Sequence, residues 1–203
     1  MQNKEGSMAG SGVPPVLPSK RATTCSAGGF QTFLLSNIQR LITPSGKTKS
    51  KFLSDQAELN NSLIVAVTET WLHSAIFDAE VTHDFPGYSL FRCDRDGRQG
   101  GGVALYVRDD LTCETLGSID NGVCELLVVQ IHQLNTVVAV LYRPPDTRIA
   151  EFTPILSQLD TLLCELQDPT PNIVLMGDFN FQDQTLSWRR SDDGLLVPLV
   201  HGH

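Results

Sequence analysis

The chain has 203 residues, of which 41% are hydrophobic and 19% are charged, as in an ordinary globular protein. This length suits one domain with a real core and is too short for two comfortable ones. No run approaches the roughly 20 apolar residues that span a bilayer, and the first 30 residues contain no apolar core of a secretory signal. We therefore expect an intracellular protein of the nucleus or cytoplasm, neither secreted nor embedded in a membrane.

The cysteines and the charge narrow the class further. Five cysteines, an odd number without a CxxC pair, argue against a disulfide framework and a zinc site, so they are interpreted as small buried residues. A net charge of −8 is unfavourable for binding nucleic acid over the whole surface, because phosphate affinity comes largely from Lys and Arg. The basic residues are clustered, however: in residues 39–51, at Arg92, Arg95 and Arg98, and at Arg143 and Arg148. Taken singly, each cluster is interpreted as a solvated face, although a few basic loops can meet an anionic substrate.

In chain order, a flexible lead-in comes first and apolar strands follow it. Residues 1–30 are rich in Gly, Ser, Pro and Thr and predict a disordered N-terminal segment. Residues 63–68 form a β-branched apolar run, which predicts a strand. Two pairs of strand-like runs then predict two hairpins, 88–92 with 103–107 and 125–131 with 136–142.

The last predicted elements are a helix and a strand. Apolar residues spaced by three and four predict an amphipathic helix over 151–166, which Asp168-Pro169 ends. Residues 173–176 predict a strand that ends at Gly177-Asp178. Several apolar strands with few helices indicate an α+β sandwich of two sheets rather than a doubly wound parallel sheet.

Three of the predicted strands end in a residue whose side chain can take part in catalysis or metal binding: Glu69, Tyr142 and Asp178. If neighbouring strands place these ends along one sheet edge, two carboxylates and a phenol meet there. Grouped carboxylates suit Mg²⁺, a hard cation that prefers oxygen ligands and keeps several waters. Charged residues commonly end strands, so one such strand indicates little, but three with motif-like flanks favour a site.

The flanks of these residues carry a family resemblance. The motifs are TETWL at 68–72, FRCDRDGR at 91–98, GGGVALYV at 100–107, YRPP at 142–145 and MGDFN at 176–180. In this order, the set resembles the endonuclease/exonuclease/phosphatase superfamily, and most of all the apurinic-type endonuclease domain of LINE-type (non-LTR) retrotransposons. The resemblance covers about residues 31–190 and leaves 191–203 as a divergent tail. It implies a deoxyribonuclease I-like fold, a two-sheet β-sandwich flanked by helices.

The resemblance also implies a role for each motif residue. Glu69 is similar to the principal metal-binding carboxylate of the family, and Asn37, in the weaker match at 32–41, to the residue that assists the metal. Asp178 would orient or deprotonate the attacking water, and Asn180 would hold that water or a phosphate oxygen. Tyr142 would contact the scissile phosphate. The implied cofactor is Mg²⁺, or alternatively Mn²⁺, and the implied partner is DNA.

The implied function is Mg²⁺-dependent hydrolysis of a phosphodiester, in which a retrotransposon endonuclease nicks target DNA. A complete domain continues after GDFN with a second Asp and a Ser-Asp-His element. His201 and His203 lie without that Ser-Asp and are not assigned. We therefore expect a fold that is incomplete at its C-terminus, with weak or no activity, because losing one member of a catalytic unit is costly. The alternatives are an inactive retrotransposon remnant or binding module, and a phosphatase of the same superfamily.

Three residues of the motifs also have plain structural interpretations. Trp71 is interpreted as a large ring that packs beside the site as a core residue rather than stacking on a base. Gly177 would let the chain turn sharply as it leaves its strand. Gly100-Gly101-Gly102 is not a phosphate-binding P-loop, because no Gly-Lys-Ser/Thr follows it.

Overall fold

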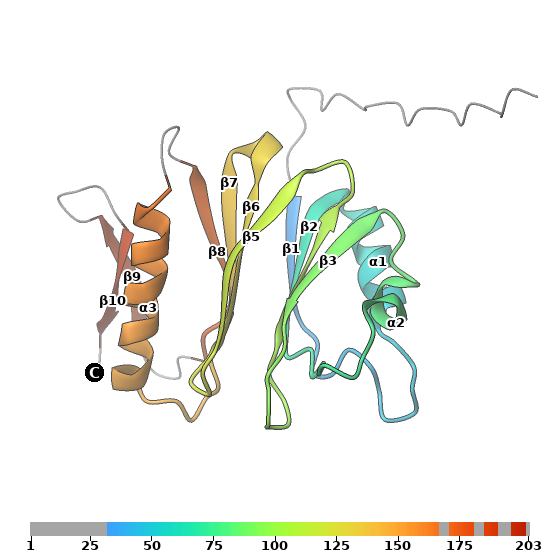
Figure 1. The fold of residues 1–203 in the computed structure, drawn as a ribbon, viewed down its shortest axis with the longest axis horizontal. Coiled ribbons are helices and arrows are strands. Elements are labelled where there is room, and N and C mark those ends of the chain that lie inside the picture. Colours follow the sequence, from blue (N-terminus) through green and yellow to red (C-terminus); the bar gives the residue numbers. More distant parts are fainter. Residues whose placement is uncertain (1–31, 167–170, 181–184, 191–195, 202–203) are drawn as a thin grey trace, which may run out of the picture.

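A computed structural model describes residues 32–166, 171–180, 185–190 and 196–201. The disordered segment predicted for 1–30, the helix stop at Asp168-Pro169 and most of the tail predicted for 191–203 lie outside the described residues. Two four-stranded sheets face each other at the centre, and helices cover their outer faces (Figure 1). The predicted two-sheet α+β sandwich flanked by helices is therefore confirmed.

The first sheet has the strand order β1-β2-β4-β3. Its strands are β1 (Thr32–Asn37), β2 (Ser62–Thr68), β3 (Tyr88–Cys93) and β4 (Val103–Arg108). The pair β3 and β4 is antiparallel, as the first predicted hairpin requires, whereas β1 runs parallel to β2. Helix α1 (Ser50–Leu59) connects these parallel strands, and the short helix α2 (Asp78–Thr82) precedes β3.

The second sheet has the order β5-β6-β7-β8. Its strands are β5 (Cys113–Asp120), β6 (Glu125–Ile131), β7 (Thr136–Tyr142) and β8 (Asn172–Asp178). Strands β6 and β7 form the second predicted hairpin, closed by the 3₁₀ turn η1 (His132–Leu134). Helix α3 (Ile149–Cys164) matches the predicted helix and links β7 to its parallel neighbour β8. Strands β9 (Thr185–Arg190) and β10 (Leu196–His201) pair separately.

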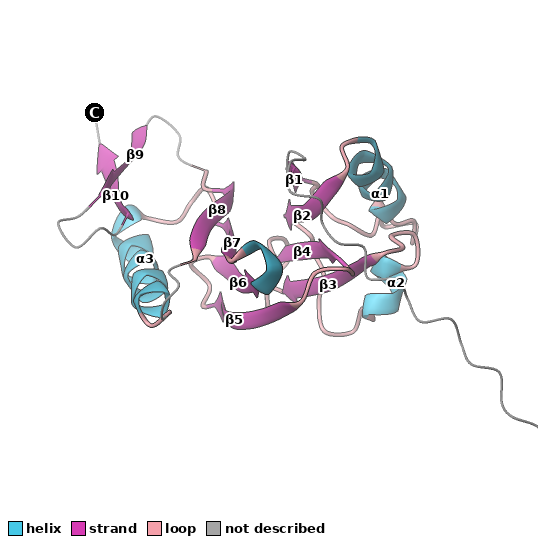
Figure 2. Ribbon diagram, turned by 90° about the horizontal axis from the view of Figure 1, so that it is seen from above, coloured by secondary structure: helices cyan, strands magenta, loops and turns pink. Residues whose placement is uncertain are grey.

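Three apolar layers hold this arrangement together. The inner faces of the two sheets form the central layer, in which Ile64 and Leu105 of the first sheet belong to one cluster with Val129 and Val140 of the second. The outer face of the first sheet packs with α1 and α2, and the outer face of the second packs with α3 (Figure 2). Strands β2 and β7 are buried along their whole length. Burial on both faces explains why their sequences are continuous apolar runs rather than alternating ones.

The strand registers bring the candidate site residues, which follow or terminate their strands, to one end of the sandwich. In the first sheet, Asn37 is the partner of Thr68, directly before Glu69. In the second sheet, Tyr142 is the partner of both Glu125 on β6 and Asp178 on β8. Glu69 thus comes from one sheet and Tyr142 with Asp178 from the other, so the ends meet across the sandwich rather than along the edge of one sheet. None of the helices in the described ranges has the length and apolar character that a bilayer crossing requires.

Gly177 is required for a reason other than the sharp turn that its sequence position suggested. It lies inside β8 with φ +150°, opposite Leu141 of β7. A Cβ added at this position would run into the backbone carbonyl of Leu141. Because strand backbone cannot move aside as a flexible side chain can, the two parallel strands come this close only with glycine at 177.

We predict that Gly177→Ala lowers the free energy of unfolding by roughly 1–3 kcal/mol or more, because the added methyl group forces β8 away from β7. Chemical denaturation measures this change. Gly46→Ala is the matched control: Gly46 also has a positive φ, +77°, but a Cβ there would meet no atom within 4 Å. Gly46→Ala should therefore cost only about 1 kcal/mol of backbone strain. Equal losses in the two variants would contradict the close approach of the strands.

Candidate active site

Three loops lie side by side at the site end of the first sheet. The loop after β1 bonds to the loop after β2, through Arg40 N to the Glu69 carbonyl at 2.7 Å and Leu41 N to the Thr70 carbonyl at 2.8 Å. The loop after β2 bonds in turn to the segment before β4, through Trp71 N to the Gly101 carbonyl at 2.9 Å. Glu69 is therefore held by its backbone from a neighbouring loop, independently of its side chain.

Backbone strain is concentrated in the same loops. Among the described non-glycine residues, seven have a positive φ, and five of these lie at the site end of the sandwich: Gln39, Arg40, Glu69, Trp71 and Asn180. The other two are asparagines, which tolerate the left-handed region. Each such residue costs roughly 1–3 kcal/mol and persists only where its surroundings fix it. Strain collected in this way is typical of a functional site.

The Glu69 carboxylate is the centre of the hydrogen-bond network. Its Oε2 accepts bonds from Trp71 Nε1 at 2.5 Å and from the Gly101 N–H at 3.0 Å. Its Oε1 accepts a bond from the Tyr142 hydroxyl, which crosses from the second sheet. A carboxylate offers about four lone-pair sites, two on each oxygen. The donors of the described residues therefore fill Oε2 and leave one lone pair of Oε1 available.

The environment of Tyr142 favours the protonated form of its hydroxyl. Burial raises the pKa of its hydroxyl, and the hydrogen bond to Glu69 and the negative charge of that carboxylate raise the pKa further. The positive charge of Arg95 acts in the opposite direction but is outweighed. Tyr142 is consequently a hydrogen-bond donor throughout the physiological pH range.

Asp178 and Asn37 form a second pair of predicted residues. Asn37 Nδ2 donates to Asp178 Oδ2 at 2.5 Å, so β1 of the first sheet meets β8 of the second. The other oxygen, Asp178 Oδ1, accepts a bond from the backbone N–H of Asn180 at 3.1 Å. The Asn180 side chain turns elsewhere, because its Nδ2 donates to the Arg143 carbonyl at 2.7 Å. The structure thus brings Asn37 to Asp178 and Glu69 to Tyr142, and holds Asn180 beside them on the Arg143 backbone.

Arg143 is a structural clamp rather than part of a solvated basic face. Its side chain is buried, and its Nη1 donates to the carbonyls of Phe179 and Asn180 at 2.8 and 2.9 Å. A further bond joins its Nη2 to the Thr147 carbonyl. Arg143 therefore holds the GDFN loop against the loop after β7. The solvated-face interpretation was wrong for this residue, although Arg148 is exposed and pairs with Glu151.

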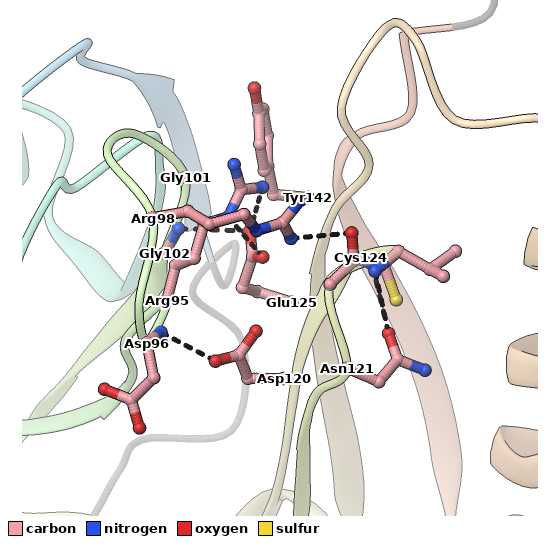
Figure 3. Close-up of polar contacts among 12 residues, drawn as sticks. Arg95, Asp96, Arg98, Gly101, Gly102, Asp120, Asn121, Cys124, Glu125 and Tyr142 are labelled. Atoms are coloured by element: carbon pink, nitrogen blue, oxygen red, sulfur yellow. Dashed lines mark hydrogen bonds and ion pairs between the residues drawn. The ribbon is translucent and has the colours of Figure 1, made fainter.

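Arg95 and Glu125 form a buried ion pair that was not predicted from the sequence. Arg95 Nε and Nη2 lie 2.6 and 2.8 Å from the two Glu125 oxygens, and the exposed fractions of the side chains are 8% and 0%. Figure 3 shows the Arg95 guanidinium between this carboxylate and Tyr142, whose ring centroid lies 5.4 Å from Cζ. Burial alone would lower the pKa of Arg95, but the Glu125 carboxylate raises it, so the guanidinium stays charged.

Trp71 is not the core residue that its sequence position suggested. Its ring is half-buried, and besides bonding Glu69 it carries Arg40 on its face, with Cζ 4.5 Å from the ring centroid. The prediction that the cysteines are small buried residues is confirmed for Cys93 and Cys124. It is wrong for Cys164, which is exposed. Burial is the main reason why the thiol pKa of Cys93 rises to about 11.

The residues present fit a hard divalent cation. Glu69, Asp178 and Asn37 offer carboxylate and amide oxygens, which Mg²⁺ and Mn²⁺ prefer, and Mg²⁺ typically takes only one or two carboxylates and keeps its waters. The available lone pair on Glu69 Oε1 could accept such a cation. Within the described residues, no group of three His, Cys, Asp or Glu side chains is placed to hold a metal.

Comparisons with known proteins identify the family and the fold. The model of the endonuclease/exonuclease/phosphatase family matches residues 35–195. The structure resembles the endonuclease domain of TRAS1, a telomere-specific non-LTR retrotransposon, with 20% identity, a TM-score of 0.50 and coverage of 74% of this chain and 60% of that one. It also resembles TDP2 from C. elegans, with 19% identity, a TM-score of 0.53 and coverage of 74% and 48%.

A third similar structure is the mannosyl-6-phosphatase of Bacteroides thetaiotaomicron, with 17% identity, a TM-score of 0.51 and coverage of 74% and 66%. At these identities the likeness shows the fold. The chain spans less than two thirds of each of the three solved structures. A search of curated proteins finds no match.

We predict that Glu125→Gln lowers the free energy of unfolding by about 3–5 kcal/mol, because it leaves the buried Arg95 charge without its counter-charge. Urea denaturation followed by circular dichroism measures the loss. Asp110→Asn is the control, since it breaks the ion pair with Arg108 on the partly exposed surface, and such pairs contribute about 0–1 kcal/mol. A Glu125→Gln loss no larger than the Asp110→Asn loss would show that the buried pair does not hold the two sheets together.

Proposed function

We propose that this chain, which belongs to the endonuclease/exonuclease/phosphatase family, hydrolyses phosphodiester bonds of DNA with the help of Mg²⁺ or Mn²⁺. The observation that carries the proposal is the meeting of Glu69, Tyr142 and Asp178 from two sheets at one strained, hydrogen-bonded end of the sandwich. Hydrolysis of a phosphodiester needs an in-line water, a base beside it and stabilisation of the negative charge that develops on the phosphoryl and leaving oxygens. These residues supply groups for each requirement.

In this proposal, each side chain has a task that its surroundings allow. Glu69 would hold the metal ion through Oε1, and the bound ion would supply polarisation of a phosphoryl oxygen and stabilisation of the leaving oxygen. Each Asp178 oxygen accepts one N–H from the described residues, so each keeps a lone pair with which to orient the attacking water or take its proton. With substrate bound, the single proton of the Tyr142 hydroxyl would turn from Glu69 Oε1 to a phosphate oxygen, which leaves Oε1 to the metal ion. The second N–H of Asn180 Nδ2 would donate to a phosphate oxygen as well.

The assignment to a non-LTR retrotransposon endonuclease rests on the motif set. In TETWL, Trp71 Nε1 donates to the Glu69 carboxylate, and in GGGVA the Gly101 N–H donates to the same oxygen. In YRPP, Arg143 donates to the Phe179 carbonyl of the GDFN loop. The motifs are thus parts of one network rather than independent signals. DNA is the substrate that this assignment names, and target-site nicking is the reaction.

We predict that the purified chain with Mg²⁺ converts supercoiled plasmid to the nicked form slowly. Asp178→Ala and Glu69→Ala should reduce the rate to that of a reaction with EDTA, since a positioned base alone contributes about 10²–10⁴-fold. Gel electrophoresis of the plasmid over time provides the measurement. Glu114→Ala is the matched control, because Glu114 is an exposed carboxylate at the far end of β5 and should leave the rate unchanged.

The proposal fails if the unmutated chain nicks no faster than Asp178→Ala. A parallel reaction with a small phosphomonoester separates the phosphatase alternative from the nuclease. Turnover of that substrate, lost in Asp178→Ala, without any nicking would replace DNA by a small phosphate ester as the substrate.

A further inference from the structure

A pocket of about 330 Å³ opens directly beside Glu69. Three loops line it: the loop after β1 with Arg40, the loop after β2 with Trp71, and the loop between β3 and β4 with Arg98 and Gly100. Trp71 belongs to both the pocket and the environment of Glu69, through the bond from Nε1 to Oε2. A Cβ on Gly100 would lie 3.7 Å from the Trp71 ring and 3.9 Å from the same carboxylate oxygen. A ligand in this pocket is therefore the immediate neighbour of a group bound at Glu69.

The charge of the pocket is opposite to that of the chain. Its lining includes Arg40, Arg95 and Arg98 and no carboxylate, whereas the whole chain has a net charge of −8. Arg95 is neutralised by Glu125. Among the ion pairs of the described residues, none involves Arg40 or Arg98. Arg98 Nη2 donates to the Gly122 carbonyl at 2.6 Å. Two guanidinium groups without a counter-charge make this pocket suited to an anion.

Arg40 is also held in place before any ligand arrives. Its guanidinium lies on the Trp71 ring, and its backbone N–H donates to the Glu69 carbonyl at 2.7 Å, which supports its positive φ of 76°. A planar guanidinium that is already oriented loses less freedom when it binds, and it matches the oxygens of a phosphate in a bidentate manner. The position of Arg40 is thereby tied to that of Glu69.

We propose that this pocket binds the phosphate of the DNA nucleotide next to the scissile phosphate, through Arg40 and Arg98. The inference rests on the proposed function, because it says where the cleaved strand lies. The volume of the pocket is near the lower limit of small-ligand sites, which is about 300–1,000 Å³. A pocket of this size suits one nucleotide unit rather than the width of a duplex. Specific placement of one phosphate also explains how an acidic chain meets a polyanion, since affinity then depends on a few local cations.

The test measures binding without cleavage. A short fluorescein-labelled DNA duplex is titrated with the chain in EDTA, and fluorescence anisotropy gives the Kd at several salt concentrations. Arg40→Gln and Arg98→Gln should each raise the Kd roughly tenfold and make the slope of log K against log salt shallower by about 0.9. Arg108→Gln is the matched control, because Arg108 ends β4 at the opposite end of the first sheet and pairs with Asp110. It should change neither quantity.

Plasmid nicking in Mg²⁺, run beside the titration, separates the two proposals. Duplex binding that depends on Arg40 and Arg98 in a chain that does not nick would support the pocket and reject the proposed function. If the chain nicks plasmid but Arg40→Gln, Arg98→Gln and Arg108→Gln change the Kd equally, the pocket proposal is rejected and the proposed function stands. Absence of duplex binding would also reject the pocket proposal. If millimolar inorganic phosphate displaces the duplex from the unmutated chain but not from Arg40→Gln, the DNA and the free phosphate compete for Arg40, which supports the pocket. Displacement that is equal in both chains would reject it.

Discussion

The ion pair between Arg95 and Glu125 is the interaction on which the geometry of the site depends. Arg95 belongs to the loop between β3 and β4 of the first sheet, and Glu125 begins β6 of the second, so the pair joins the two sheets where the site lies. Glu125 Oε2 also accepts the Gly102 N–H at 3.1 Å, and the neighbouring Gly101 N–H reaches Glu69. Since Glu125 is the register partner of Tyr142, one buried carboxylate helps to position both Glu69 and Tyr142. The same loop is tied to the end of β5 by the bond from Asp96 N to Asp120 Oδ2 (Figure 3). The bond from Arg98 to the Gly122 carbonyl ties it to the turn that follows.

The chemistry follows from this cross-sheet construction. A single sheet would place only the ends of adjacent strands together, as Tyr142 and Asp178 are. Facing a second sheet adds Glu69 and Asn37 from the opposite side, where Glu69 accepts a bond from Tyr142 and Asn37 donates to Asp178. The strained loops at Arg40, Glu69 and Trp71 are the cost of turning these side chains inward, and the backbone bonds among the loops offset it. The arginine pocket beside Glu69 depends on the same loops, because the backbone N–H of Arg40 donates to the Glu69 carbonyl.

The sequence predicts the strands well where both faces are buried, because β2, β6, β7 and much of β4 are then long apolar runs. Helix α1 escaped prediction, since its buried face consists of only Ser50, Leu53 and Ala57. Strand β5 escaped too, because it lies at a sheet edge, has no fully buried residue and has an irregular register near Gly117. The strand-end residues were found because each lies in a short motif. Arg95 and Glu125 are 30 residues apart, and only a lone charge opening the apolar run ELLVVQI marked Glu125.

The central claim, that Glu69 is the metal-binding carboxylate of a site assembled by two sheets, is tested most directly by the fluorescence of Trp71, whose Nε1 donates to Glu69. With Trp188→Phe as background, Trp71 is the one tryptophan left in the chain. The account predicts that Mg²⁺ changes the Trp71 emission with saturation, and that Glu69→Gln abolishes this response while Glu114→Gln preserves it. An emission that does not respond to Mg²⁺, or that responds equally in Glu69→Gln, would contradict the account.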